Sequence, residues 1–429
     1  MKKNRTRKAS AKGTFGSRRS APAGQSRLAG VILNARTALR ELVLTAGLEV
    51  FSEMLEDDRA AICGPKHRPM PDRRAYRHGH DEGCLVFGGR KIRVRKPRIR
   101  SVEGEEMELE TWRRMADEDP LRDRVVEQIL LGVSQRGYER SLEPLPVSAS
   151  ARGTRRSSVS RQFQARTTQQ TESFLSRSLE GIDLPVILID GTGLGDHMLL
   201  VALGIDATGK KHILGVAVGT TESEQVCRSL FGNLIDRGLV VERARLFVID
   251  GAKGLRKAIR TTFGDWAVVQ RCQIHKLRNV AEHLPQHRRA WVKAAMRKAW
   301  KSGTVDSARH RLEQLATRLD DEHPDAARSI REGLDETLTV IRLGLDGGLL
   351  RTLRSTNPIE NLQGTIQRVA RNVKRWRGGS MARRWCVTAL VEAEKRFRRV
   401  KGHRDMPQLI AALDAIVNKK VLDTKEQVA

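Results

Sequence analysis

The sequence has few cysteines and no long apolar run, and both shortages exclude classes of protein. Its five cysteines are odd in number and scattered along 429 residues, so we expect a reducing compartment and no disulfide framework. No apolar run approaches the length of a membrane span. The first 27 residues are basic and polar, unlike a secretory signal. We therefore expect a cytoplasmic protein with no membrane partner.

Acidic residues are also scarce. Asp and Glu number 51 against 79 Lys and Arg, which gives a net charge of +28. Residues 1–40 contain eleven basic residues and no acidic one. This excess predicts a polyanionic partner, and nucleic acid comes first because its phosphates release counterions when basic side chains neutralise them. A basic tail along DNA is the main expectation for the N-terminus, and a solubilising tail is the alternative.

The chain is long enough for several domains. Composition and periodicity divide it into a disordered basic tail (1–27), a helical and β-hairpin DNA-binding region (28–119), a helical, helix-turn-helix-like DNA-binding region (120–180), the first part of an α/β core (181–279), a helical insertion (280–352), the C-terminal helices of the core (353–404) and a tail helix (405–429).

The region before residue 119 predicts a helix and a hairpin. Apolar spacing favours a helix from Leu28 to Cys63, and alternating basic and apolar residues from Cys84 favour a short hairpin with one cationic face. The clustered residues Cys63, His67, His78, His80 and Cys84 raise the question of zinc. Their spacing fits no paired ligand pattern, so a loop with incidental histidines is the first expectation and zinc stays open.

Three helices are predicted between residues 120 and 180, over 121–133, 137–145 and 157–179. The third opens on a polar turn that carries Ser157 and Arg161. This order predicts a helix-turn-helix, in which a short turn joins two helices and the polar first turn of the second helix presents side chains to the major groove. A plain helical bundle with a solvated face is the alternative.

Two apolar runs stop on the dipeptide Asp-Gly. The first is Leu184-Pro-Val-Ile-Leu-Ile-Asp190-Gly191 and the second is Arg245-Leu-Phe-Val-Ile-Asp250-Gly251. Short Val- and Ile-rich runs are typical of strands buried on both faces. Carboxylates at the ends of adjacent strands suit a divalent metal, whereas a turn is the ordinary explanation of either Asp-Gly alone.

The order of elements around these runs predicts a ribonuclease H-like fold. Three antiparallel strands, a helix and further parallel strands would form one mixed five-stranded sheet; the strands are expected at 185–190, 198–206, 212–219, 245–250 and 267–271. In that fold the first and fourth strands are neighbours. Asp190 and Asp250 would therefore lie side by side.

The chain downstream of the sheet predicts a packed pair, a helical stretch and a long basic helix. Cys272 and His275 supply too few ligands for structural zinc, so a packed cysteine with a hydrogen-bonded histidine is expected. Residues 280–349 have helical spacing. The next helix would run to Trp376, and from spacing alone Glu360 closes a capping box with Asn357.

Thirteen basic and two acidic residues occupy 365–404. Arg368, Arg371 and Lys374 recur at helical spacing, which makes them candidates for phosphate contacts together with the neighbouring Arg375. Trp376 and the more distant Trp385 are candidates for stacking on an unpaired base. A solvated charged helix is the alternative.

Four stretches resemble the Mutator-like transposases of bacterial insertion sequences. They are Leu188-Ile-Asp190-Gly191, Val248-Ile-Asp250-Gly251-Ala-Lys-Gly-Leu255, Arg271-Cys272-Gln-Ile-His275-Lys-Leu-Arg278-Asn279 and Thr356-Asn357-Pro-Ile-Glu360-Asn361. The spacing also fits, with 60 residues from Asp190 to Asp250 and 110 from there to Glu360. The clustered Cys and His residues of 63–84 have no place in this pattern.

The resemblance implies a DDE transposase on a ribonuclease H-like fold. Asp190, Asp250 and Glu360 would be catalytic and would bind two Mg²⁺ ions, with Mn²⁺ as a substitute, and Cys272 with His275 would be a structural signature near the site. Its partners would be terminal inverted repeats and target DNA, which it would cleave and join as a homodimer or higher oligomer at the bacterial nucleoid. A catalytically inactive, domesticated DNA-binding regulator is the alternative, and a junction-resolving nuclease would cut without joining.

Overall fold

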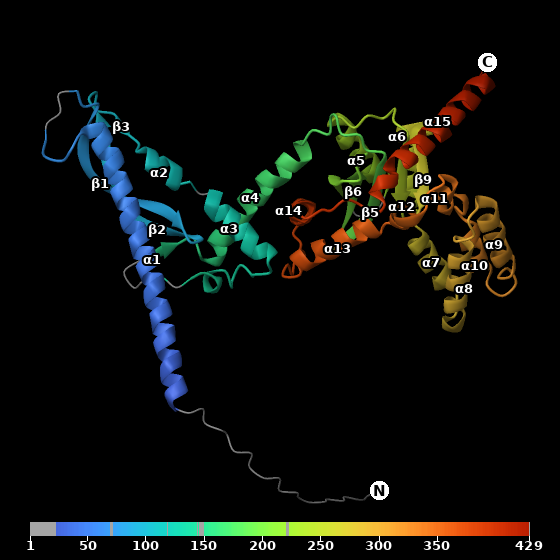
Figure 1. The fold of residues 1–429 in the computed structure, drawn as a ribbon, viewed down its shortest axis with the longest axis horizontal. Coiled ribbons are helices and arrows are strands. Elements are labelled where there is room, and N and C mark those ends of the chain that lie inside the picture. Colours follow the sequence, from blue (N-terminus) through green and yellow to red (C-terminus); the bar gives the residue numbers. More distant parts are fainter. Residues whose placement is uncertain are drawn as a thin grey trace, which may run out of the picture. The chain divides into compact units, whose positions relative to one another are not determined.

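The computed structural model describes residues 23–68, 72–117, 119–143, 145, 150–219 and 223–428 (Figure 1). The chain divides into two compact units. The first comprises Met1–Leu121 with Glu139–Thr154, and the second comprises Arg122–Tyr138 with Arg155–Ala429. Among the described residues, no helix combines the length and apolar character that crossing a membrane requires.

The first unit consists of a long helix packed on a hairpin. Its elements are α1 (Ala23–Cys63), β1 (Ala75–Phe87), β2 (Arg90–Ser101), β3 (Glu106–Met107), α2 (Glu110–Met115), the 3₁₀ helix η1 (Glu139–Ser141) and β4 (Ala151–Arg152). Strand β2 pairs with all three other strands in antiparallel fashion. Phe51, Leu55, Leu85, Ile99 and Trp112 form its core, so one face of α1 covers one face of the hairpin.

Two predictions for this unit are confirmed and one is wrong. Helix α1 ends at Cys63 as expected, although it begins before Leu28, and the cationic hairpin is present. The predicted loop around His78 and His80 is wrong, because β1 already begins at Ala75. A register shift between Arg77 and His80 interrupts the alternation that would have marked this strand. Of the predicted basic tail, residues 1–22 lie outside the described residues.

The second unit is built on a mixed sheet of five strands in the order β7-β6-β5-β8-β9. The strands are β5 (Val186–Leu194), β6 (His197–Ile205), β7 (Lys211–Gly219), β8 (Arg245–Ile249) and β9 (Ala267–Arg271). The first three are antiparallel, and β8 and β9 run parallel to β5. The predicted mixed sheet is confirmed, and its first and fourth strands, β5 and β8, are neighbours.

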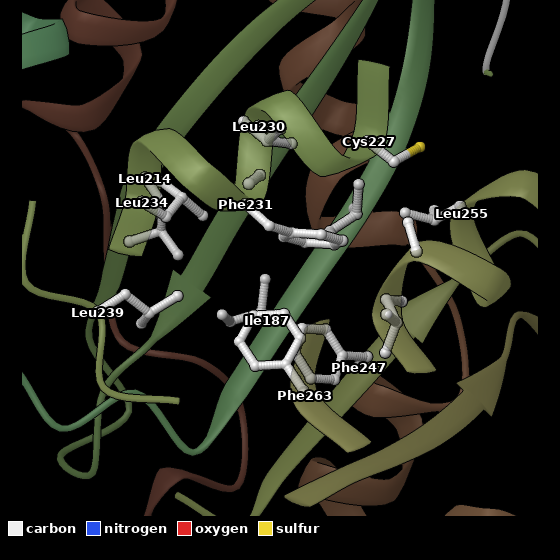
Figure 2. Close-up of a cluster of buried hydrophobic side chains, with 14 of the residues drawn as sticks. Ile187, Leu214, Cys227, Leu230, Phe231, Leu234, Leu239, Phe247, Leu255 and Phe263 are labelled. Atoms are coloured by element: carbon white, nitrogen blue, oxygen red, sulfur yellow. The ribbon is translucent and has the colours of Figure 1, made fainter. Parts of the chain in front are cut away.

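Helices α5 (Glu224–Asp236) and α6 (Lys253–Phe263) cover one face of this sheet. Figure 2 shows Phe231, Phe247 and Phe263 meeting at the centre of the apolar layer beneath them. Their ring centroids lie 4.8 to 6.3 Å apart. This separation is typical of aromatic packing and gives the sheet a rigid support.

The opposite face of the sheet carries the two aspartates. Ile187, Ile189, Phe247 and Ile249 belong to the apolar layer under α5 and α6. Because side chains alternate along a strand, Asp190 at the next position of β5 points to the other face. Helices α13 (Asn357–Ala370) and α14 (Gly379–Glu394) contact β5, β6 and β7 without joining that apolar layer, so they cover this second face.

A helical insertion separates β9 from α13. It contains α7 (Gln273–Glu282), α8 (Gln286–Ala299), α9 (Val305–Thr317), α10 (Pro324–Arg331), the 3₁₀ helix η3 (Asp335–Thr337), α11 (Thr339–Arg342) and α12 (Gly347–Leu353). Trp300 and Leu312 lie in its separate apolar core. The prediction of a wholly helical segment is confirmed. The remaining elements of the unit are α3 (Asp119–Leu130), α4 (Arg156–Ser176), the 3₁₀ helices η2 (Gly264–Trp266) and η4 (His403–Asp405), and α15 (Met406–Val428).

The helix predicted over 137–145 is wrong. The described residues there form a turn and the three-residue η1. Helix α3 ends where Gly132 adopts a φ of +97°, and Ser134 Oγ then accepts the backbone N–H of Gly137 and closes a turn. Residues 131–155 thus separate α3 from α4. The short turn of the predicted helix-turn-helix is absent from the part of the chain that the structure describes.

The long basic helix predicted to reach Trp376 is also wrong, since α13 ends at Ala370. Tertiary contacts of the following segment explain the early end. Asn372 Nδ2 donates a hydrogen bond to the carbonyl of Gly132, at 3.0 Å. The indole of Trp376 packs so closely over Gly195 that a Cβ there would overlap it. A turn at Arg371 and Asn372, followed by irregular backbone, replaces the helix.

Candidate functional site

Asp190 lies in β5, and Asp250 directly follows the neighbouring parallel strand β8. The register between these strands pairs Val186 with Leu246 and Leu188 with Val248, a constant offset of 60 residues. Two residues further on, the same offset matches Asp190 with Asp250. Strands in a sheet lie about 4.8 Å apart, so a single cation can reach carboxylates at matched positions.

Glu360 reaches the same place from α13. Its helix is attached to the edge of β5 by two amide side chains, which follow Glu360 by three and seven residues and therefore share its face. Gln363 Nε2 donates to the carbonyl of Gly191 at 2.8 Å, and Gln367 Nε2 donates to that of Gly193 at 2.7 Å. These bonds orient the first turn of α13 toward Asp190.

In the part of the chain that the structure describes, one group of three potential metal ligands forms. Ligand atoms of Asp190, His275 and Glu360 all lie within 4.8 Å of one another. Asp250 is not a member of this group, although its charge acts on His275. The structure therefore brings two of the three predicted carboxylates together and holds the third on the adjacent strand.

His275 stands on the first turn of α7 beside a buried thiol. Cys272 begins that helix, and its Sγ accepts the backbone N–H groups of His275 and of Thr356. A hydrogen bond with Cys272, aided by the charges of Asp190 and Asp250, raises the pKa of His275 to about 9. Burial opposes ionisation of the Cys272 thiol, yet the hydrogen bonds from His275 and Thr356 lower its pKa. At neutral pH the imidazole is thus a cation among carboxylates.

Glu360 is free of the capping role that its spacing suggests. Residue Thr356 precedes α13, and no side-chain hydrogen bond caps that helix. Oε1 of Glu360 is buried without a hydrogen-bond partner, and the nearest cations are Arg278 at 3.6 Å and His275 at 3.8 Å. A buried carboxylate oxygen without a hydrogen bond next to Asp190 has the chemistry that a hard divalent cation requires.

The second Asp-Gly contains a glycine that the packing requires. Gly251 has a φ of +107°, and an added Cβ would overlap the guanidinium of Arg271. Arg271 is 5% exposed, and its Nη1 donates to the carbonyl of Glu332 at 3.0 Å. Asp250 also serves its turn, because its Oδ1 accepts the N–H of Ala252 at 2.9 Å. The turn role and a ligand role are compatible, since the turn uses one oxygen.

Comparison with known proteins identifies the family. A family model described as "Transposase, Mutator family" matches residues 29–400. The chain belongs to the Mutator family of transposases. It is 28% identical over 345 residues to the transposase for insertion sequence element ISRM5 of Rhizobium meliloti (strain 1021), a match that covers 79% of this chain and 83% of that protein. It is 26% identical over 336 residues to the transposase for insertion sequence element IS256 in transposon Tn4001 of Staphylococcus aureus, covering 74% and 81%.

In this Mutator-family chain the predicted DNA-contact residues occupy three settings. Arg368 lies on α13 and is exposed. Arg371, Lys374, Arg375 and Trp376 follow the end of that helix, so the shared helical face predicted for the first two with Arg368 is wrong. Ser157 and Arg161 are exposed on α4.

Trp385 is unavailable for stacking on a base. It is 6% exposed, and its ring lies 4.6 Å from that of Phe163 in the packing of α14 against α4. The cysteines and histidines of 63–84 form no group of three ligands among the described residues. His80 instead approaches Glu56, at 3.6 Å.

Three functional candidates were missed in the sequence. Gln363 and Gln367 follow Glu360 at helical spacing, and that periodicity was the available signal. Arg278 lies within a quoted motif, but its approach to Glu360 depends on the return of the chain after the helical insertion. No local pattern reports such a contact.

Proposed function

We propose that this chain is the transposase of an insertion sequence that binds terminal inverted repeats and catalyses DNA strand cleavage and strand transfer with Asp190, Asp250 and Glu360. The observation that carries the proposal is the approach of Glu360 to Asp190 across 170 residues of sequence, within 4.8 Å and beside the strand that Asp250 directly follows. Membership of the Mutator family supports the same activity.

The sheet supports assignment to the ribonuclease H-like folds. Three antiparallel strands precede two parallel ones, and the first strand lies next to the fourth. Asp190 then lies within β5 and Asp250 directly follows β8, on a face covered by the helix that carries the third carboxylate. A rigid sheet edge with a docked helix is the support that a metal site needs.

In the proposed mechanism the three carboxylates would hold two Mg²⁺ ions. When bound, such ions activate the attacking water or 3′-hydroxyl and neutralise charge on the departing oxygen. Gln363 and Gln367 keep Glu360 oriented toward Asp190. Arg278, whose side chain is 53% exposed, is available to bind a DNA phosphate beside Glu360. His275 places its positive charge beside Glu360, with Nε2 at 3.8 Å from Oε1.

The proposal is tested by strand cleavage of terminal-repeat DNA in Mg²⁺. We expect Asp190→Asn, Asp250→Asn and Glu360→Gln each to lower the cleavage rate at least 100-fold while binding to the same DNA persists. Asp236→Asn, on the exposed end of α5, is a matched control that should cleave normally. Unchanged cleavage in any of the three variants would remove that residue from the mechanism.

Two other outcomes distinguish neighbouring functions. Binding without cleavage by the unaltered chain would indicate a domesticated regulator that has lost the chemistry. Cleavage without joining of the freed 3′ end to a second duplex would indicate a resolving nuclease. Replacement of Mg²⁺ by Mn²⁺ should preserve activity, since both are hard cations that accept carboxylate oxygens.

At least a dimer is proposed on DNA, because two element ends must be brought together. Helix α1 supports this, since Leu39, Val43 and Val50 are more than half exposed although apolar. With Ala46 they repeat at alternating steps of four and three, the spacing of a coiled-coil seam. Mass measurement on the DNA complex tests the dimer. Replacement of Leu39, Val43 and Val50 by Glu should convert dimers to monomers. Monomers of the unaltered chain on paired ends would refute the dimer.

A further inference from the structure

A cavity of about 610 Å³ lies in the second unit, away from the three carboxylates. Its walls come from the turn after α3, the start of α4, the segment between α13 and α14, and the start of α14. Phe163 and Trp385 contribute apolar surface to its floor, and Ser160, Gln164 and Asn372 contribute polar groups. We call this cavity the cationic pocket, for the following reason.

Six basic residues and no acidic one line the cationic pocket. They are Arg136, Arg156, Lys374, Arg375, Arg377 and Arg384. Basic side chains elsewhere in this unit commonly face a carboxylate, as Arg166 faces Asp123 at 2.6 Å in the neighbouring larger cavity. Within the described ranges none of the six forms an ion pair. Convergent cations without counter-charges repel one another, so the arrangement favours binding of an anion.

Arg384 is the most deeply placed of the six. Its side chain is half-buried, and its Nε lies in the interior without a hydrogen-bond partner. Burial lowers its pKa below the ordinary value for arginine, which means that the folded chain holds this charge at a cost. An anion in the pocket would offset that cost through its charge.

The segment after α13 links the pocket to the turn that follows β5. It lines the pocket with Lys374, Arg375 and Arg377, while the intervening Trp376 packs over Gly195. Gly195 directly follows β5, the strand that contains Asp190. The pocket and the carboxylates therefore belong to connected parts of the same unit.

We propose that the cationic pocket binds backbone phosphates of the DNA that leads to the catalytic carboxylates. The inference rests on the proposed function, which supplies DNA as the polyanion. It adds Arg136, Arg156, Arg377 and Arg384 to the DNA-contact surface. The pocket is larger than one phosphate group requires, so it accommodates two successive phosphates with the sugar between them.

The test uses the full chain and a labelled 30-base-pair duplex of the element end. Arg136, Arg156 and Arg377 are exposed, so their joint replacement by Gln should leave the fold intact. Each lost phosphate contact reduces the slope of log affinity against log salt by about 0.9. We expect the slope of the triple variant to fall by about 2 to 3, and its affinity at low salt to fall at least tenfold.

A matched control separates the pocket from net charge. Arg297, Lys298 and Lys301 are exposed at the end of α8 and form no ion pair in the described ranges, so their replacement by Gln removes the same charge elsewhere. This control should keep most of the slope. Equal losses in the two triple variants would mean that only overall charge matters, and an unchanged slope in the pocket variant would overturn the proposal outright.

Methylphosphonate substitution locates the contact. Neutral linkages placed singly along the duplex should weaken binding by the unaltered chain at one or two positions, and the pocket variant should be indifferent at those positions. If inorganic phosphate protects the pocket but no methylphosphonate linkage weakens DNA binding, the pocket is a site for a free anion, and the proposal that it binds DNA is rejected. Competition by polyglutamate as strong as that by DNA would point to an acidic protein and would also reject it.

Failure of this inference and failure of the proposed function give different results. Asp190→Asn should bind with an unchanged salt slope, because the carboxylate contributes no cationic contact. If Asp190→Asn loses cleavage while the pocket variant binds normally, the inference alone fails. If Asp190→Asn still cleaves, the catalytic proposal fails and the slope of the pocket variant still decides the pocket.

Discussion

Replacement of Gln363 and Gln367 by Leu should uncouple Glu360 from β5 without unfolding the chain. Each side-chain amide donates one hydrogen bond to a backbone carbonyl of β5, and each bond is worth about 1 kcal/mol of stability. Gln367 is exposed, so its share is the smaller one. The pair therefore contributes less than about 2 kcal/mol to the free energy of unfolding.

The effect on rate should be larger than the effect on stability. A displacement of about 1 Å at a reacting group can cost about 100-fold, and each tenfold loss corresponds to about 1.4 kcal/mol of barrier. Without its two bonds, α13 can slide along β5 and carry Glu360 with it. We expect the cleavage rate at saturating DNA to fall 10- to 100-fold, while the affinity for DNA changes less than twofold.

The assay is single-turnover cleavage of labelled terminal-repeat DNA in Mg²⁺, with binding measured separately in Ca²⁺. Gln408→Leu is the control, because Gln408 Nε2 also donates to a glycine carbonyl, that of Gly344, at 3.2 Å. It should cleave at the normal rate. A double variant that melts normally and cleaves normally would refute the positioning role, and with it the argument that the amides hold the site together.

Two further predictions concern stability. Gly251→Ala should lower the free energy of unfolding by about 3 to 5 kcal/mol, because alanine is strained at this positive φ and its Cβ displaces the buried Arg271. Gly303→Ala is the control and should cost about 1 kcal/mol, since Gly303 has a φ of +85° with open space around it. Equal shifts of the urea midpoint in the two variants would contradict a collision with Arg271. Burial, with Arg271 nearby, lowers the pKa of Lys276 to about 8, so the unfolded chain binds more protons between pH 8 and 10.5 and stability should rise across that window. The unfolding free energy of the unaltered chain minus that of Lys276→Met should therefore increase by about 3 kcal/mol from pH 7.5 to 10.5. A constant difference would reject the burial argument.

The sheet was predictable because its strands are marked locally. β8 and the first half of β5 are nearly continuous apolar runs, and the turn between β6 and β7 is marked by Gly209. The order of elements indicates a fold in which the first and fourth strands are neighbours, and this order predicted that Asp190 and Asp250 lie close together. In such segments, propensity, periodicity and tertiary packing favour the same conformation, which is the condition under which sequence patterns are reliable.

The segment after α13 shows where local patterns fail. Basic residues at helical spacing continue past Ala370, yet the chain leaves the helix to seat Trp376 over Gly195 and to join Asn372 to Gly132. Those partners lie more than 100 residues away, so no window of sequence contains them. Intrinsic preference for helix is worth only tenths of a kcal/mol per residue, and a few tertiary contacts outweigh it.

The 110 residues between Asp250 and Glu360 do not by themselves determine where Glu360 lies, because the two ends of the helical insertion meet. The chain leaves the sheet at Cys272 and returns at Thr356, and the two ends are bonded to each other: Gln273 donates its N–H to the carbonyl of Arg354 at 2.9 Å, and Thr356 donates its N–H to Cys272 Sγ at 3.4 Å. The helices between have an apolar core of their own. The position of Glu360 therefore depends on this closed junction and on the amides of α13, and helices can be lengthened beyond the junction without moving the carboxylate.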